Sequence, residues 1–134
     1  MHRHGYVGRK LGREKDQRGA LIKGLATSLV IYGKVETTCP KAKELIRYIE
    51  KVITKAKKGD LNNRRMVIAS LNTQEAAHRL IEEIAPKLAN RTSGHIRLKK
   101  TDLRVGDGSQ MAIVEFVDDI SSTKDPVETN EEKK

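Results

Sequence analysis

The chain has 134 residues, of which 34% are charged and 37% hydrophobic, and its formal net charge is +9 at pH 7. This length suits a single domain, and the basic excess favours an anionic partner, either nucleic acid or an anionic membrane surface. The single cysteine excludes a disulfide framework and a cysteine-based metal site, and three tyrosines with one phenylalanine are too few for a surface that stacks single-stranded bases.

The N-terminal segment, residues 1–17, is basic and has few side chains that could form a core; Glu14 and Asp16 are its only acids. Burial cannot offset the ordering entropy of such a segment, so we predict an extended arm that a polyanion orders by counterion release. A tail that only aids solubility is the alternative that composition leaves open. The arm residues that we assign to RNA binding are Arg3, His4, Arg9, Lys10 and Arg13.

Hydrophobic periodicity predicts a first helix from Arg18 to Tyr32, which Gly33 ends. Alternation of apolar and polar residues over Lys34–Thr38 predicts a short strand. Pro40 then stands in the first turn of a second helix. The apolar stripe of this second helix, which its lysines and arginines largely avoid, comprises Ala42, Leu45, Ile46, Ile49, Val52, Ile53 and Ala56.

A third helix is predicted from Leu61 to Leu71, and a fourth helix follows it. Asn72 and Glu75 resemble a capping box at the start of the fourth helix. The apolar stripe of this helix runs on to Leu88 through Pro86, and we therefore expect the helix to kink or restart at the proline.

Two strands complete the predicted domain. Ile96 and Leu98 alternate with cations in the first strand, and residues 110–117 form the second strand after a glycine-containing turn. Since apolar residues lie on both faces of this second strand, we expect it to be covered on both sides. From Ile120 onward the sequence is typical of a disordered tail.

The predicted order, α-β-α-α-α-β-β, indicates an α+β fold in which a small three-stranded sheet packs with helices. We assign residues 1–17 to the basic arm, 18–118 to one domain and 119–134 to a mildly acidic tail. No apolar run reaches the length of a membrane span, and no apolar segment follows the first cations, so we expect neither a membrane span nor a secretory signal.

Further cations form separate groups on the predicted helices and strands. Any one group is more often a solvated face than a binding site, but together they favour a polyanion as partner. Those that we assign to RNA binding are Arg18, Lys23, Lys41, Lys43, Arg47, Arg64, Arg65, Arg97, Lys99, Lys100 and Arg104.

Residues that could carry catalysis or hold a metal are few. We expect His78 and His95 to lie on the surface, and Cys39 has no partner that the sequence can place. His2 and His4 have no further ligand at a suitable spacing, and the glycines of residues 5–12 do not follow a predicted strand. We therefore expect no enzymatic activity, cofactor, metal or small-molecule substrate.

Two rival functions stay open on the residues alone. The third and fourth helices could form a DNA-binding helix-turn-helix, although Glu75 and Ala76–Ala77 would read bases poorly. The other rival is an enzyme that acts on RNA.

Several segments resemble the L17 family of bacterial large-subunit ribosomal proteins, and the matches are collinear over residues 1–118. The most distinctive is the run TTCPKAKEL at Thr37–Leu45, and HGYVGRKLGR at residues 4–13 resembles the family's start. Shorter matches are VITKAK at 52–57, NRR at 63–65, RVGD at 104–107 and MAIVEFVD at 111–118. The chain departs from the family pattern at Gln17 and at Lys23–Gly24.

This resemblance implies a structural protein of the large ribosomal subunit, without catalytic activity, that binds 23S-type RNA near the peptide exit region. The implied partners are this RNA and neighbouring large-subunit proteins, and the implied location is the bacterial ribosome in the cytoplasm. The resemblance assigns RNA contacts to Arg3, His4, Arg9, Lys10, Arg13, Arg18, Lys41, Lys43, Arg64 and Arg65.

Overall fold

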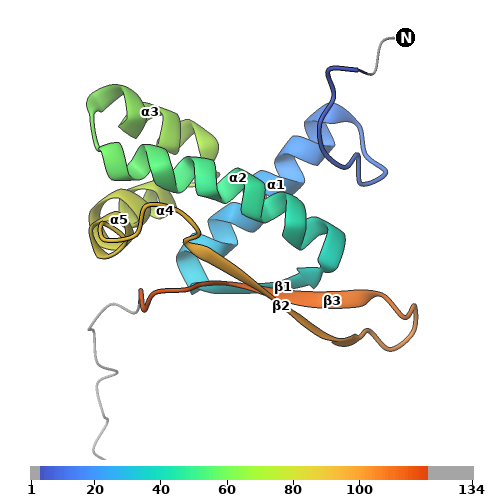
Figure 1. Cartoon of the computed structure of the whole chain (residues 1–134). Helices are drawn as coiled ribbons and strands as arrows, with labels where there is room; N and C mark the ends of the chain where they lie inside the picture. Colours follow the sequence, from blue (N-terminus) through green and yellow to red (C-terminus); the bar gives the residue numbers. More distant parts are fainter. Residues whose placement is uncertain (1–3, 121–134) are drawn as a thin grey trace, which may run out of the picture.

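The computed structural model describes residues 4–120, in which helices cover one face of a three-stranded sheet (Figure 1). The elements are α1 (Lys15–Tyr32), β1 (Lys34–Thr38), α2 (Cys39–Lys58), α3 (Leu61–Ser70), α4 (Gln74–Arg79), the π-helical turn η1 (Leu80–Ile84), α5 (Ala85–Lys87), β2 (Ile96–Leu103) and β3 (Gln110–Phe116). Since α4, η1 and α5 follow one another without a break, the predicted α+β class and element order are confirmed.

The sheet has the order β1-β3-β2, and both pairings are antiparallel. Val114 in the central strand lies opposite Val35 of β1 and Leu98 of β2, so three apolar side chains form one row across the sheet. Val114 is fully buried beneath the helices. This row forms the side of the hydrophobic core that the sheet contributes.

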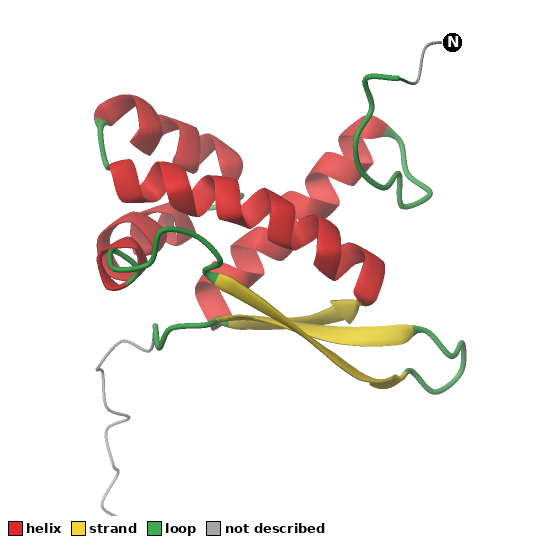
Figure 2. Cartoon of the chain, viewed as in Figure 1, coloured by secondary structure: helices red, strands yellow, loops and turns green. Residues whose placement is uncertain are grey.

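Within residues 4–120, the helices cover one face of the sheet and leave the other open (Figure 2). On β3, Val114 and Phe116 are buried, whereas Met111 and Ile113 on the opposite face are half-buried. The prediction that this strand is covered on both sides is therefore wrong. The register places Ile113 between Glu36 and Lys99, whose aliphatic stems can shield an apolar side chain without a second layer.

The helix α2 is the centre of the domain. Its predicted stripe faces inward, since Leu45, Ile49 and Ile53 are fully buried. Pro40 stands in the first turn, as predicted, where its missing N–H costs nothing. With one face of α2 in the core, its outer face is left for polar residues.

The helix α1 begins at Lys15, three residues before the predicted start. It ends at Gly33, which adopts a left-handed conformation (φ 78°) and donates its N–H to the Leu29 carbonyl at 2.8 Å. Ile120 packs against this turn and is buried, so the predicted tail begins too early at this residue. The remainder of the predicted tail, residues 121–134, lies outside the described residues.

The fourth helical segment differs from its prediction at the start and has an altered hydrogen-bond pattern before Pro86. Its N-cap is Thr73, whose hydroxyl accepts the N–H of Ala76 at 3.3 Å, and not Asn72. Before Pro86 the bonding widens to a π-helical turn, in which the Ala85 N–H donates to the Leu80 carbonyl. This wider turn accommodates the proline ring, which would clash with a carbonyl of the preceding turn in a regular α-helix.

Candidate nucleic-acid interface

A line of cations follows the outer face of α2. Lys43, Arg47, Lys51 and Lys58 are exposed there, and we call them the α2 ridge. Residues four apart on a helix lie about 6 Å apart along its axis, so Lys43, Arg47 and Lys51 form an evenly spaced row. The ridge cations have no carboxylate partner in residues 4–120, which leaves their charges available to an anion.

A hollow of about 410 Å³, which we call the arm groove, lies between the N-terminal arm, α1 and α2. Figure 1 shows the arm beside the start of α1. The groove is lined by five cations and by Glu44 as its one carboxylate. These cations are Arg9, Lys15, Arg18, Arg47 and Lys51.

The arm is held against the body by contacts of Tyr6. The Arg18 guanidinium lies 5.1 Å from the centroid of the Tyr6 ring and the Lys10 ammonium 5.7 Å from it, which are cation–π distances. The Tyr6 hydroxyl donates to the Arg9 carbonyl at 3.0 Å. Arg9 itself approaches Glu44 at 4.0 Å. Disorder of the isolated arm stays a prediction.

On the open face of the sheet, Arg97 and Lys99 are paired with a carboxylate. Glu115 of β3 accepts hydrogen bonds from Lys99 at 2.8 Å and from the Arg97 Nε at 3.0 Å, both on β2. These bonds hold the pKa of the Glu115 carboxyl below its ordinary value. The cluster therefore carries one net positive charge instead of two.

Two further predicted cations are paired. Arg104 in the β2–β3 turn binds Asp107 through its Nε at 3.1 Å, and this contact holds the pKa of Asp107 well below its usual range. Arg64 of α3 donates to Glu82 at 2.7 Å, whereas its neighbour Arg65 is exposed and unpaired within the described chain. The predicted pair of arginines is thus one ion-paired residue and one free cation.

The predicted RNA-binding residues fall into two groups according to these partners. Without a carboxylate partner in the described range are Lys10, Arg13, Arg18, Lys23, Lys41, Lys43, Arg47, Arg65 and Lys100. Paired with a carboxylate are Arg9, Arg64, Arg97, Lys99 and Arg104. His4 belongs to the exposed arm, and Arg3 lies outside the described residues.

The structure adds three cations that we did not assign to the site. Lys15 and Lys51 line the arm groove, and Lys58 extends the α2 ridge. Spacing along α2 could have indicated Lys51 and Lys58, because both follow Arg47 at helical intervals. Lys57, the neighbour of Lys58, is instead turned inward, where it donates to the Arg91 carbonyl.

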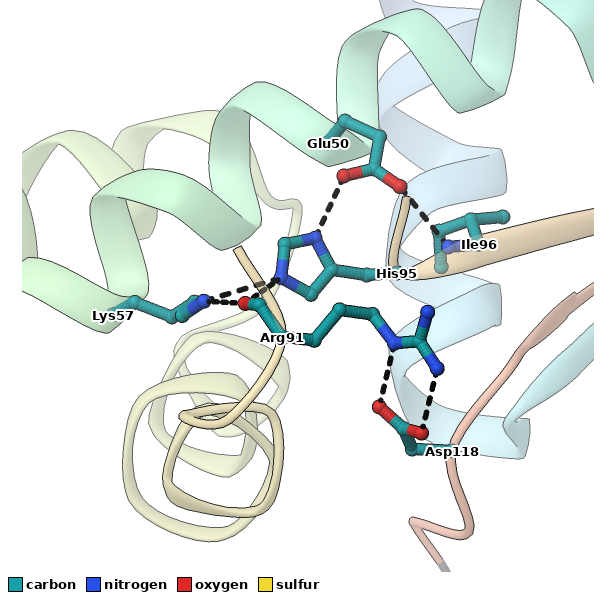
Figure 3. A network of polar contacts seen from close by, with 6 residues as sticks. All are labelled: Glu50, Lys57, Arg91, His95, Ile96 and Asp118. Atoms are coloured by element: carbon teal, nitrogen blue, oxygen red, sulfur yellow. Dashed lines mark hydrogen bonds and ion pairs between the residues drawn. The ribbon is translucent and has the colours of Figure 1, made fainter. Parts of the chain in front are cut away.

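This inward lysine belongs to a polar network around His95 (Figure 3). His95 is 1% exposed, so its predicted place on the surface is wrong. Its Nδ1 lies 2.7 Å from a Glu50 carboxylate oxygen, and the other oxygen accepts the Ile96 N–H at 3.0 Å. Its Nε2 lies 3.3 Å from the Lys57 ammonium. With the ring proton assigned to Nδ1, the ring donates to Glu50 and accepts from Lys57.

The network joins α2 to the start of β2, and it continues to the end of the described chain through Arg91. The Arg91 guanidinium donates to both oxygens of Asp118, at 3.1 and 3.2 Å, and lowers the pKa of that carboxyl. Because its polar groups bond one another, the network fixes the position of the sheet under α2. We assign it a structural role.

No helix within residues 4–120 is both long enough and apolar enough to cross a membrane. Nor does this part of the chain bring together three or more His, Cys, Asp or Glu side chains that could hold a metal ion.

Comparison with known proteins gives one consistent family. Residues 21–117 match the family model described as ribosomal protein L17. A Campylobacter lari protein named large ribosomal subunit protein bL17 is 53% identical over 116 residues, which cover 87% of this chain and 97% of that protein. A Helicobacter hepaticus protein of the same name is 56% identical over 116 residues, with 87% and 98% covered.

Proposed function

The chain belongs to the ribosomal protein L17 family, and from this membership we propose that it binds the RNA of the large ribosomal subunit through phosphate contacts. Membership makes it a structural component of that subunit and not an enzyme. The proposed partners are 23S-type RNA and neighbouring large-subunit proteins, in the bacterial cytoplasm. The position near the peptide exit region is supported by the family resemblance alone.

One observation carries the proposal for RNA. The α2 ridge and, apart from Arg9, the arm groove hold cations without carboxylate partners among residues 4–120, whereas Arg97, Lys99 and Arg104 on the sheet side are held by Glu115 and Asp107. Unpaired lysines and arginines release counterions when they meet phosphates, and this release supplies most of the affinity. The ridge and the groove are therefore the surface that meets RNA.

The same arrangement indicates how RNA is recognised. Double-stranded RNA offers a protein mainly its shape, its phosphates and its 2′-hydroxyls, because its deep major groove excludes side chains. An evenly spaced row such as Lys43, Arg47 and Lys51 can follow a phosphate backbone without reading bases. Arg65, exposed on α3, adds one further cation beyond this row. The proposed binding is thus specific for the fold of the RNA more than for its sequence.

Recognition of DNA by α3 and α4 is disfavoured by burial. A recognition helix presents polar side chains at its N-terminal turn, which enters the major groove. In α4 that turn contains Ala76 and Ala77, both fully buried in the core. The exposed residues of this turn are Gln74 and Glu75, and the Glu75 carboxylate would be repelled by DNA phosphates.

The test compares a structured fragment of large-subunit RNA with duplex DNA of equal length, titrated with the full chain at matched salt. We expect tighter binding to the RNA, with log affinity falling by about 0.7–0.9 per phosphate contact for each unit of log salt. Equal or tighter binding to the duplex DNA would refute the proposal. Footprinting of assembled subunits tests the position near the peptide exit.

A further inference from the structure

We propose that the arm groove is a preformed site for the phosphate backbone of a single RNA strand, and that Tyr6 and Gly8 form it by holding the arm in place. This inference rests on the proposed function, because it assumes that RNA is the polyanion. It goes further in naming the subsite, the part of the RNA that it takes, and two uncharged residues that control it.

The walls of the groove supply an anion site with cations on both sides. Arg9 comes from the arm, Arg18 from α1, and Arg47 and Lys51 from α2. Because Glu44 is the only carboxylate among the lining residues, the groove keeps a large positive excess in the free protein. The like charges on the walls of one groove repel one another. Bound phosphates therefore lower the electrostatic free energy of the protein as well as that of the RNA.

The size and shape of the groove favour a sugar-phosphate strand over a base. The hollow of about 410 Å³ is open to solvent, and its cations come from the arm, α1 and α2. Arg47 and Lys51 lie about 6 Å apart along α2, an interval that suits successive phosphates of one strand. The Tyr6 ring also lines the groove, but Arg18 and Lys10 already stack on it. This ring is therefore not free to stack on a base.

The docking of the arm depends on Tyr6. Its ring carries Arg18 of α1 at 5.1 Å and Lys10 of the arm at 5.7 Å, and therefore connects the arm to the body. Its hydroxyl bonds the Arg9 carbonyl at 3.0 Å and closes the turn that precedes Arg9. Without this ring, the Arg9 side chain would leave the wall opposite α2. Tyr6 is thus a positioning residue for a cation next to it.

The second contact that docks the arm is at Gly8. Its backbone has φ +121°, a conformation that side-chain-bearing residues rarely adopt. A Cβ at this position would lie 3.1 Å from a carboxylate oxygen of Glu44, closer than ordinary van der Waals contact. A side chain at this position would therefore strain the backbone and displace the Glu44 carboxylate, so glycine favours the docked path of the arm. Tyr6 and Gly8 are both uncharged, so they determine the positions of the groove cations and not the net charge of the protein.

The experiment uses full-length variants that alter docking without altering net charge. Tyr6→Leu and Gly8→Ala remove the two contacts, and Tyr6→Phe keeps the ring. The matched controls are Tyr32→Leu, at a tyrosine that is 75% exposed outside the groove, and Gly5→Ala, where a Cβ meets no atom within 4 Å. Affinity for the large-subunit RNA fragment is measured across a salt series. Trypsin cleavage after Arg9 and Lys10 is measured without RNA.

We expect Tyr6→Leu and Gly8→Ala each to lower RNA affinity about five-fold. This fold-change matches the free energy of one exposed cation–π contact at the upper end of its range. The log–log salt slope should fall by about 0.7–0.9, because one phosphate contact is lost, and cleavage in the arm should accelerate. Arg9 can make this contact because its Nε lies 4.0 Å from Glu44, beyond hydrogen-bond distance, so Glu44 does not hold it as Asp107 holds Arg104. Tyr32→Leu and Gly5→Ala should match the wild type. Tyr6→Phe keeps the ring but loses the hydroxyl bond to the Arg9 carbonyl, so its affinity and slope should lie between those of Tyr6→Leu and the wild type. Wild-type affinity and slope in both docking variants would overturn the inference, and so would weaker binding with unchanged cleavage. Failure of the wild-type chain to bind the RNA would instead refute the proposed function.

Discussion

Two cations of the α2 ridge should account for a large share of RNA affinity. Arg47 and Lys51 are exposed and have no carboxylate partner among the residues that the structure describes. Each phosphate contact contributes about 0.7–0.9 to the slope of log affinity against log salt, which at 0.1 M salt corresponds to about five- to eight-fold in affinity. The double variant Arg47→Gln/Lys51→Gln should therefore lose about 1.4–1.8 from the slope and about 25- to 60-fold in affinity.

A control with the same change in net charge separates unpaired cations from total charge. Arg64→Gln/Arg104→Gln also removes two positive charges, but these side chains are bound one to one by Glu82 and Asp107. Since each such pair is already neutralised by the protein, we expect its loss to change the slope by less than about 0.5. Both double variants should unfold within about 0.5 kcal/mol of the wild type, as exposed substitutions usually do.

The assay is fluorescence anisotropy of a labelled large-subunit RNA fragment, titrated with each variant from 0.05 to about 0.4 M salt, the range over which such slopes are well defined. Equal losses in the two double variants would refute the reasoning, because affinity would then depend on total charge and not on which cations are free. An unchanged slope in the ridge variant would show that RNA meets another face of the protein.

Two further predictions concern stability. Lys99 and Arg97 hold the pKa of Glu115 below its ordinary value of 4.5, so the ionised carboxylate stabilises the fold at neutral pH and this contribution is lost as the pH falls through the lowered pKa. Glu115→Gln should therefore lower the melting temperature at pH 7 and flatten its decline in acid; parallel curves for variant and wild type would contradict this. His95→Ala should cost about 2–4 kcal/mol in denaturant unfolding, because it leaves a cavity and removes the ring partner of Glu50 and Lys57. A loss below about 1 kcal/mol would show that the network around His95 is not a structural one.

Local sequence patterns were sufficient to predict where the helices and strands form. The stripe of α2, its early proline and the glycine after α1 predicted elements that the structure contains, because periodic burial and backbone sterics act between residues close in sequence. The basic arm and the cationic face of α2 were also visible in this way, since composition and helical spacing alone place those charges. The family resemblance needed only the order of residues along the chain.

The sequence could not determine which cations are free, because that depends on partners distant along the chain. Lys99 pairs with Glu115 only through the register of β2 on β3, and Arg64 meets Glu82 only where α3 packs near the fourth helical segment. Burial of His95 likewise depends on Glu50, 45 residues away, and the open face of the sheet depends on all helices packing on one side. Short-range sterics thus set the elements and the total charge, whereas tertiary packing decided which charges remain available to RNA.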